Sequence, residues 1–152
     1  MTAGPVPGND DPAFIALAGV PLFAGISAAS LANIESFAFR KTFQPGDLIV
    51  EENHTGNGMY VVLSGSVEVV RGLAGERPQL ITVLGTGEVF GEMALLGDWK
   101  RTASVRAIEE TECLGLDRWV FLAHLQREPE IAIRMLHVLA GRLAALDQAV
   151  FG

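Results

Sequence analysis

From residue 37 to residue 116, short apolar runs of strand length recur through the middle of the chain. Glycine, proline and aspartate separate the short apolar runs, as in Pro45-Gly46-Asp47. The pattern predicts strands over 48–50, 59–63, 67–70, 79–84, 105–107 and 112–116. Before them, Phe37, Phe39 and Phe43 are expected to share one face of a half-buried strand. Short strands with turns about every eight to twelve residues are typical of a barrel or sandwich.

Helical patterns flank this region on both sides. Pro12 should begin a short helix that ends near Ala18, and Ser27 should cap a second one. Asp117 should cap a third helix, and Pro129 should begin a longer one. The predicted fold is mainly β with flanking helices: a jelly-roll type β-roll of about eight strands, short N-terminal helices and two C-terminal helices. The predicted domains are a flexible tail over 1–11, a β-roll domain over 12–127 and a long C-terminal helix over 128–152.

The long helix carries two apolar stripes. One follows the alternating four- and three-residue steps of a coiled-coil seam: Ala132, Leu136, Leu139, Leu143, Leu146 and Val150. The other lies on an adjacent face: Ile131, Met135, Val138 and Ala145. Two stripes indicate a second contact surface, and they predict a homodimer through this helix or contact with an effector domain or protein. The alternative is one broad stripe that lies on the β-roll.

The composition limits which partners and which cellular location can be expected. The net charge is −7, from 11 Lys+Arg against 18 Asp+Glu, which argues against direct binding to nucleic acid. An anionic ligand must therefore be held by local donors. The single Cys113 excludes an internal disulfide and fits a reducing cytoplasm, where we expect it to be a buried apolar residue. The uncharged run over 13–33 is interrupted by Gly19, Pro21 and Gly25, so neither a signal peptide nor a membrane span is expected.

The residues that could bind a ligand are concentrated between Phe90 and Val105. A helical turn beginning at Gly91 would leave its first backbone N–H groups available to an anion. Arg101 offers a planar, permanently charged donor fork that suits a phosphate. Glu92 offers acceptors for a sugar hydroxyl, and Ala94 leaves room for a ligand near the backbone. A phosphate together with a sugar hydroxyl indicates a nucleotide.

The two runs 90–96 and 101–105 resemble the phosphate-binding cassette of cyclic-nucleotide-binding domains, and the resemblance extends over about residues 20 to 145. It implies that Glu92 binds the ribose 2′-hydroxyl and that Arg101 binds the cyclic phosphate. The ligand-binding residues it implies are Phe90, Gly91, Glu92, Met93, Ala94, Arg101, Thr102 and Ala103. The implied ligand is a 3′,5′-cyclic nucleotide. Cyclic AMP is expected in preference to cyclic GMP, although Thr102 suits either, and the C-terminal helix is expected to move on binding.

Other readings remain open. The cassette could be an ordinary buried turn with a solvated Arg101, or the chain could be a degenerate, ligand-free β-roll that binds proteins. The segment around His54 resembles that of a metal-binding cupin. A cupin needs a second histidine to bind the metal, and Gly56 occupies that position here. Because His54, His124 and His137 fall on separate elements, with the latter two expected on helix surfaces, no metal site and no enzymatic activity are predicted.

The chain reaches Gly152 without a helix-turn-helix after the long helix. Regulators of the catabolite activator type read DNA through such a domain, so this chain is not expected to read DNA in that way. The expectation is a cytoplasmic sensor that stands alone or serves as the binding domain of a longer protein.

Overall fold

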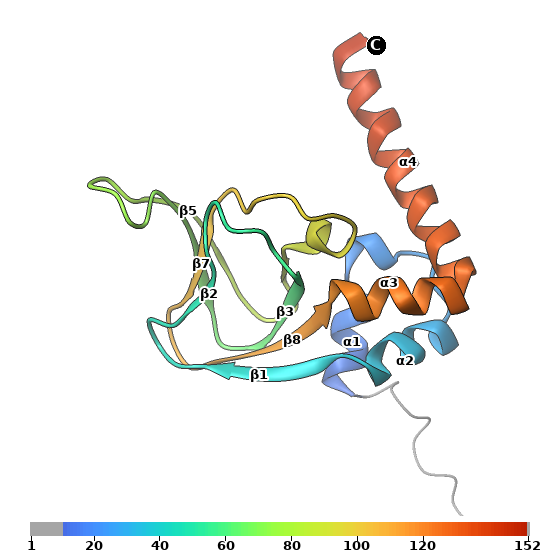
Figure 1. The fold of residues 1–152 in the computed structure, drawn as a ribbon, viewed down its shortest axis with the longest axis horizontal. Helices are drawn as coiled ribbons and strands as arrows, with labels where there is room; N and C mark the ends of the chain where they lie inside the picture. The colour runs from blue at the N-terminus through green and yellow to red at the C-terminus, as the bar shows by residue number, and fades with distance from the viewer. Residues whose placement is uncertain (1–10, 152) are drawn as a thin grey trace, which may run out of the picture. The chain divides into compact units, whose positions relative to one another are not determined.

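The computed structural model describes residues 11–151, which form two compact units (Figure 1). Residues 37–122 form a β unit, and residues 11–36 together with 123–151 form a helical unit. Helix α3 (Arg118–Arg127) runs across the boundary between the two. Between residues 11 and 151, no helix is both long and apolar enough to cross a bilayer. The division into domains at residue 127 stays a prediction.

Within the described residues, the β unit holds two four-stranded antiparallel sheets, ordered β1-β8-β3-β6 and β2-β7-β4-β5. This confirms the predicted mainly β fold with flanking helices. A short 3₁₀ turn, η2 (Glu92–Leu95), follows β6. The strands are β1 (Phe39–Phe43), β2 (Leu48–Val50), β3 (Gly58–Ser64), β4 (Val67–Arg71), β5 (Gln79–Leu84), β6 (Val89–Phe90), β7 (Ser104–Ala107) and β8 (Thr111–Asp117).

The core of the β unit draws apolar side chains from both sheets, because alternate residues of each strand point to the same side. Burying each large apolar side chain contributes roughly 1.5–3 kcal/mol. Cys113 is fully buried, as expected, and burial raises the pKa of its thiol to about 12. It therefore packs as a neutral thiol. The buried cluster is Phe43, Val62, Val67, Phe90, Val105, Ala107 and Cys113.

Strand β1 is more exposed than the sequence predicts. Phe43 is buried but Phe39 is 41% exposed. Both rings meet Tyr60 edge to face, with centroids 6.2 Å apart, so they do share a face. Phe39 stands opposite Gly115, where a Cβ would collide with its ring. The face of β1 therefore runs from the core into a pocket instead of ending in the interior.

The helical unit contains α1 (Pro12–Ala18), η1 (Pro21–Phe23), α2 (Ala28–Ser36) and α4 (Pro129–Phe151), together with the last residues of α3. The predicted start of α1 at Pro12 and the predicted caps Ser27 and Asp117 are confirmed. The Asp11 carboxylate accepts from Ala13 N at 2.8 Å, and the Ser27 hydroxyl accepts from Ser30 N at 3.1 Å. In the β unit, Asp117 accepts from Val120 N at 3.1 Å and so caps α3.

The two apolar stripes of α4 have different surroundings. Ile131 and Met135 are only 1% and 2% exposed, and this end of the helix packs on η1. The seam residues Leu136, Leu143, Leu146 and Val150 are instead 63–71% exposed. A monomer of this structure therefore leaves four large apolar side chains of one seam in water.

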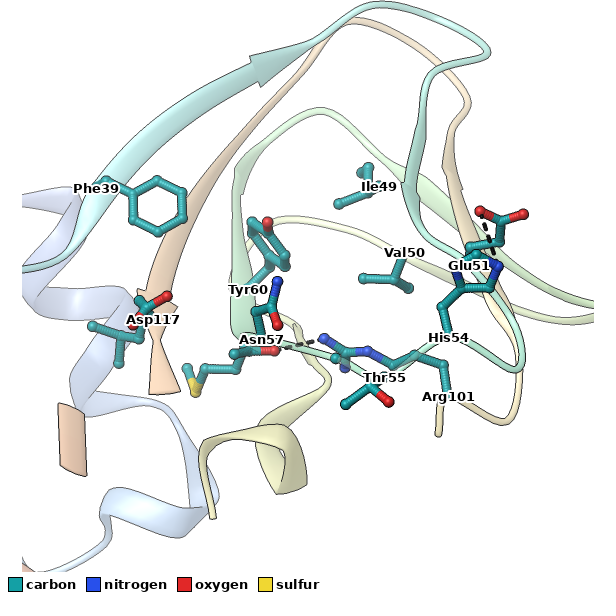
Figure 2. A pocket seen from close by; sticks show the side chains of 14 residues that line it. Phe39, Ile49, Val50, Glu51, His54, Thr55, Asn57, Tyr60, Arg101 and Asp117 are labelled. Atoms are coloured by element: carbon teal, nitrogen blue, oxygen red, sulfur yellow. Dashed lines mark hydrogen bonds and ion pairs between the residues drawn. The ribbon is translucent and has the colours of Figure 1, made fainter. Parts of the chain in front are cut away.

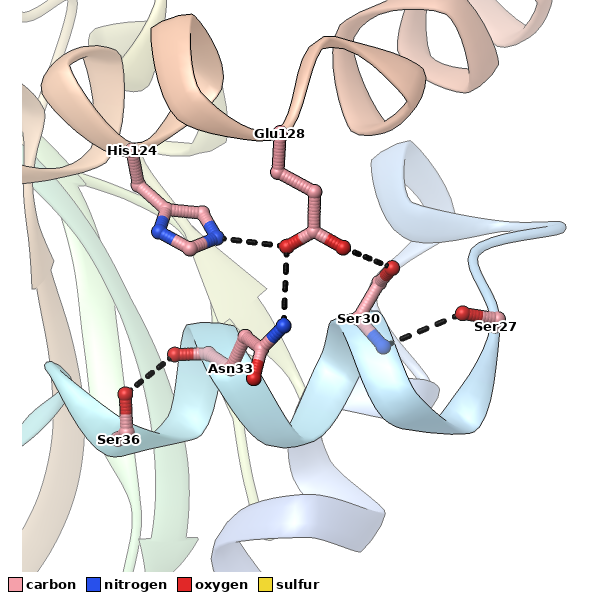
Figure 3. Close-up of polar contacts among 6 residues, drawn as sticks. All are labelled: Ser27, Ser30, Asn33, Ser36, His124 and Glu128. Carbon is pink, nitrogen blue, oxygen red and sulfur yellow. Dashed lines mark hydrogen bonds and ion pairs between the residues drawn. The ribbon is translucent and has the colours of Figure 1, made fainter.

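A polar cluster joins α2 to the end of α3 around the carboxylate of Glu128 (Figure 3). Ser30 Oγ donates to Oε2, Asn33 Nδ2 donates to Oε1 at 3.1 Å, and His124 Nε2 lies 2.8 Å from Oε1. The prediction that His124 is a surface residue is wrong: its side chain is 13% exposed, because pairing with Glu128 one turn later turns the ring inward.

These hydrogen bonds make the stability of the folded protein depend on pH in the acidic range. The hydrogen bond from Ser30 is the main cause that lowers the pKa of Glu128, and bonds from Asn33 and His124 add to it. A carboxylate with a lowered pKa in the folded state stabilises the protein above its unfolded pKa, and that contribution is lost as pH falls through the folded value. Thermal unfolding should show Glu128→Gln less stable than the wild type at pH 7, with the difference shrinking below about pH 4.5. An unchanged difference at pH 3 would contradict this.

Candidate functional site

A pocket of about 410 Å³ lies in the β unit beside Arg101 (Figure 2). Apolar side chains cover part of its wall, and a polar loop, 51–58, covers another part. Its lining residues are Phe39, Ile49, Val50, Glu51, His54, Thr55, Gly56, Asn57, Gly58, Met59, Tyr60, Arg101, Leu116 and Asp117. A cavity with apolar walls and a few convergent polar groups is the usual form of a small-molecule site.

The loop 51–58 is fixed to the segment around Arg101 through backbone bonds. Asn53 N donates to Arg101 O at 2.8 Å, and Arg101 N donates to His54 O at 2.8 Å. Thr55 and Lys100 form an isolated antiparallel bridge next to these bonds. Asn53 takes a left-handed conformation with φ 70°, which asparagine tolerates better than most residues. The loop and Arg101 therefore behave as one structural element.

The Arg101 side chain reaches back from this segment toward Asn57 (Figure 2). Its Nη2 donates to Gly58 O at 2.7 Å. A Cβ at Gly56 or at Gly91 would displace the guanidinium from this position, so glycine at both positions allows Arg101 to lie there. Gly91 also has φ 74°, a conformation that glycine adopts without strain. The guanidinium thus lies closely between the pocket loop and the start of the predicted cassette.

The charge of Arg101 is only partly compensated by the protein. Its Nε is buried and has no hydrogen-bond partner among residues 11–151. Burial lowers the pKa of Arg101 from its ordinary value, the Tyr60 hydroxyl opposes that shift, and nearby Arg118 adds to it. Because arginine is effectively always protonated in proteins, the group stays charged. A partly desolvated guanidinium with an unused donor is a strong site for an anion.

The predicted cassette forms the turn that follows β6. Phe90 is buried and stacks on Tyr60, with ring centroids 5.5 Å apart. After Gly91, Glu92 begins η2, a 3₁₀ turn rather than an α-helical one. Ala94 is buried while Met93 is 38% exposed, and the Oε2 atom of Glu92 is buried.

Tyr60 connects the cassette to the pocket. Its ring contacts Phe39, Phe43 and Phe90, and it lines the pocket together with Arg101. Burial raises the pKa of its hydroxyl; Arg101 opposes this and Cys113 adds to it. The phenol is therefore neutral near pH 7 and presents an aromatic wall with one polar end.

Of the eight residues predicted for the site, Arg101 alone lines this pocket. Gly91 touches Arg101, and Phe90 touches Tyr60. Thr102 is exposed and Ala103 is partly buried just after Arg101. Whether these eight residues bind a ligand stays a prediction. The predicted site did not include the pocket loop, Tyr60, Phe39 or Asp117. Within the loop, only Gly56 and Gly58 are local signals in the sequence that could have indicated a site there.

Comparisons with known proteins agree with this architecture. A family model described as cyclic nucleotide-binding domain matches residues 40–128. The "Cyclic AMP receptor protein" of Thermus thermophilus is 36% identical over 129 residues, which are 85% of this chain and 60% of that protein. The chain spans 57% to 60% of the length of the first curated relatives that it matches.

Two solved structures are similar in fold and sequence. The N-terminal domain of a transcriptional regulator from Streptomyces coelicolor A3(2) superposes with a TM-score of 0.82 at 30% identity, covering 90% of this chain and 96% of that one. The Catabolite Activator Protein of Thermus thermophilus gives a TM-score of 0.68 at 35% identity and covers 86% and 62%. The chain belongs to the cyclic nucleotide-binding domain family, a family of regulatory sensor domains and not of catalytic ones.

Proposed function

We propose that this cyclic nucleotide-binding domain senses a 3′,5′-cyclic nucleotide whose phosphate is bound by Arg101. The observation that carries the proposal is the partly buried guanidinium of Arg101, which lines a pocket and keeps an unused Nε donor among the described residues. The planar donor fork of arginine matches phosphate as well as carboxylate. The family match over residues 40–128 supplies the class of ligand.

The remaining cassette residues complete the proposed site around that phosphate. Glu92 accepts from the ribose 2′-hydroxyl, and the backbone near Gly91 and Met93 offers N–H groups to the phosphate, whereas Ala94 N already donates to Gly91 O at 3.0 Å and Ala94 contributes room beside the backbone. In a 3₁₀ turn such as η2, the first N–H groups have no partner within the turn itself. Phe90, Thr102 and Ala103 close the cradle. The negative net charge of the chain means that these local donors, and not a general field, hold the anion.

Cyclic AMP is the proposed ligand in preference to cyclic GMP. The support is the name of the Thermus thermophilus relative, a cyclic AMP receptor protein that is 36% identical over most of this chain. Calorimetric titration of the purified protein with cyclic AMP, cyclic GMP and 5′-AMP tests both parts of the proposal. Tighter binding of cyclic AMP supports it. If none of the three nucleotides gives a binding signal, the proposed function is overturned.

Signalling is proposed to pass through α4. The exposed seam of Leu136, Leu143, Leu146 and Val150 supports a homodimer in which α4 of one copy packs on α4 of the other. Binding of the nucleotide then changes how α4 docks and is read by an effector domain or protein. A cytoplasmic location is part of the same proposal and is consistent with the buried, protonated thiol of Cys113.

The proposed role of Glu92 predicts a preference for a nucleotide whose ribose carries a free 2′-hydroxyl. A carboxylate that accepts from a hydroxyl forms a charge-assisted bond worth roughly 1.5–3 kcal/mol. Wild-type protein should therefore bind cyclic AMP about ten-fold or more tightly than its 2′-deoxy analogue. Glu92→Gln should lose most of that preference in a side-by-side titration. Equal wild-type affinities for the two analogues would remove Glu92 from the site.

A further inference from the structure

Arg118, the first residue of α3, is a buried cation that the site described above does not use. It is 4% exposed, and its Nη1 is within hydrogen-bond distance of three backbone carbonyls. The acceptors are Gly56 O at 2.9 Å, Gly97 O at 2.7 Å and, at the longer distance of 3.5 Å, Ala94 O. Taking a guanidinium out of water is costly, so such a group persists only where its donors find partners.

These carbonyls belong to the two segments that enclose Arg101. Gly56 lies in the pocket loop, Ala94 lies in the first run of the cassette, and Gly97 directly follows that run. The backbones of Gly56 and Gly91, one from each segment, both lie against the Arg101 guanidinium. The backbone of Arg118 adds a further link, since its N–H donates to Asn57 O at 2.7 Å. Arg118 therefore bonds both walls of the cleft in which Arg101 lies.

We propose that Arg118 is a positioning residue that holds the pocket loop and the cassette together around Arg101, and so sets the affinity for the phosphate without touching it. This inference rests on the proposed function. Small displacements of a charged binding group cause large losses, and two segments that can move independently would no longer fix the guanidinium. Without Arg118, the buried carbonyl of Gly56 would also lose its partner.

Arg118→Met tests the proposal, because methionine keeps an apolar stem of similar length and removes all the donors. Arg106→Met is the matched control: Arg106 bonds Glu68 across β7 and β4 and does not line the pocket. Each variant is checked for folding by circular dichroism at low temperature and titrated with cyclic AMP. Arg118→Met is expected to bind about ten-fold or more weakly than the wild type, and Arg106→Met to bind as the wild type does.

A second readout separates positioning from simple loss of stability. The Nε–H resonance of Arg101 in ligand-free protein, measured by nitrogen-15 NMR, should shift in Arg118→Met together with the amide of Gly56, and should stay in place in Arg106→Met. If the wild type binds no cyclic nucleotide, the proposed function fails, and the shift alone still decides whether Arg118 positions Arg101.

A folded Arg118→Met that binds cyclic AMP within about three-fold of the wild type, with an unmoved Arg101 resonance, would overturn the proposal. Should Arg118→Met not fold, Arg118→Gln takes its place, because the amide restores two donors without the charge. The same outcomes then apply. Tryptophan fluorescence gives an additional check on the surroundings of Arg118. The Arg118 guanidinium lies 5.0 Å from the centre of the Trp119 ring, and the Trp99 ring lies against Gly97.

Discussion

Replacing Arg101 with alanine is expected to weaken cyclic-nucleotide binding by about thirty-fold to several thousand-fold while the β unit stays folded. The proposed phosphate would lose its one charged partner in the pocket, and removing one side of a desolvated charge pair costs roughly 2–5 kcal/mol. The fold should survive, because the bonds of Arg101 with Asn53 and His54 use its backbone and are kept by alanine. The side chain contributes one bond, to Gly58 O.

The measurement is calorimetric titration with cyclic AMP, accompanied by thermal unfolding. Arg106→Ala is the matched control, because it removes an arginine that pairs with Glu68 elsewhere in the β unit. Arg101→Lys separates charge from shape: an ammonium keeps the charge but loses the planar fork, so its affinity should fall between those of alanine and arginine. An alanine variant that binds within about three-fold of the wild type would refute the role of Arg101.

The elements of the fold were predictable because each depends on local sequence. Short apolar runs between turn residues located β2, β4 and β5 within a residue or two, although most side chains of β5 are exposed. Ser27 and Asp117 signalled helix starts because their side chains cap backbone groups three residues away. Periodicity was less informative for β1, where the predicted apolar face runs from Phe43 in the core to Phe39 in the pocket.

The site was only partly predictable. Arg101 and Gly91 belong to a compact motif, so the sequence itself brought them to attention. The pocket loop is joined to Arg101 by backbone bonds between segments about fifty residues apart, as from Asn53 to Arg101, and backbone bonds leave no side-chain signature. Arg118 follows a capping aspartate and looks like an ordinary helix start. Its carbonyl partners lie 21 to 62 residues away, which only the folded chain reveals.

The exposed seam of α4 leads to the other large expected effect, on self-association. Replacing Leu143 and Leu146 together with aspartate should raise the dimer dissociation constant at least about a hundred-fold. Each side chain is more than 60% exposed in the monomer, so the fold loses little. In the proposed dimer each leucine would contribute roughly 1.5–3 kcal/mol by burial, and facing aspartates would repel. His137→Asp/Gln148→Asp is the matched control, since both residues are exposed on the opposite face of α4.

Sedimentation of the wild type and both double variants, with and without cyclic AMP, makes the comparison. The wild type and the control should dimerise, and the seam variant should stay monomeric. If the nucleotide binds the dimer and the monomer with different affinities, then linkage requires the wild-type dimer constant to differ between free and fully bound protein, by the square of the ratio of the two affinities, because each dimer binds two nucleotides. A wild type that remains monomeric at high micromolar concentration in both states would refute the dimer, and α4 would then have to signal from within a single copy.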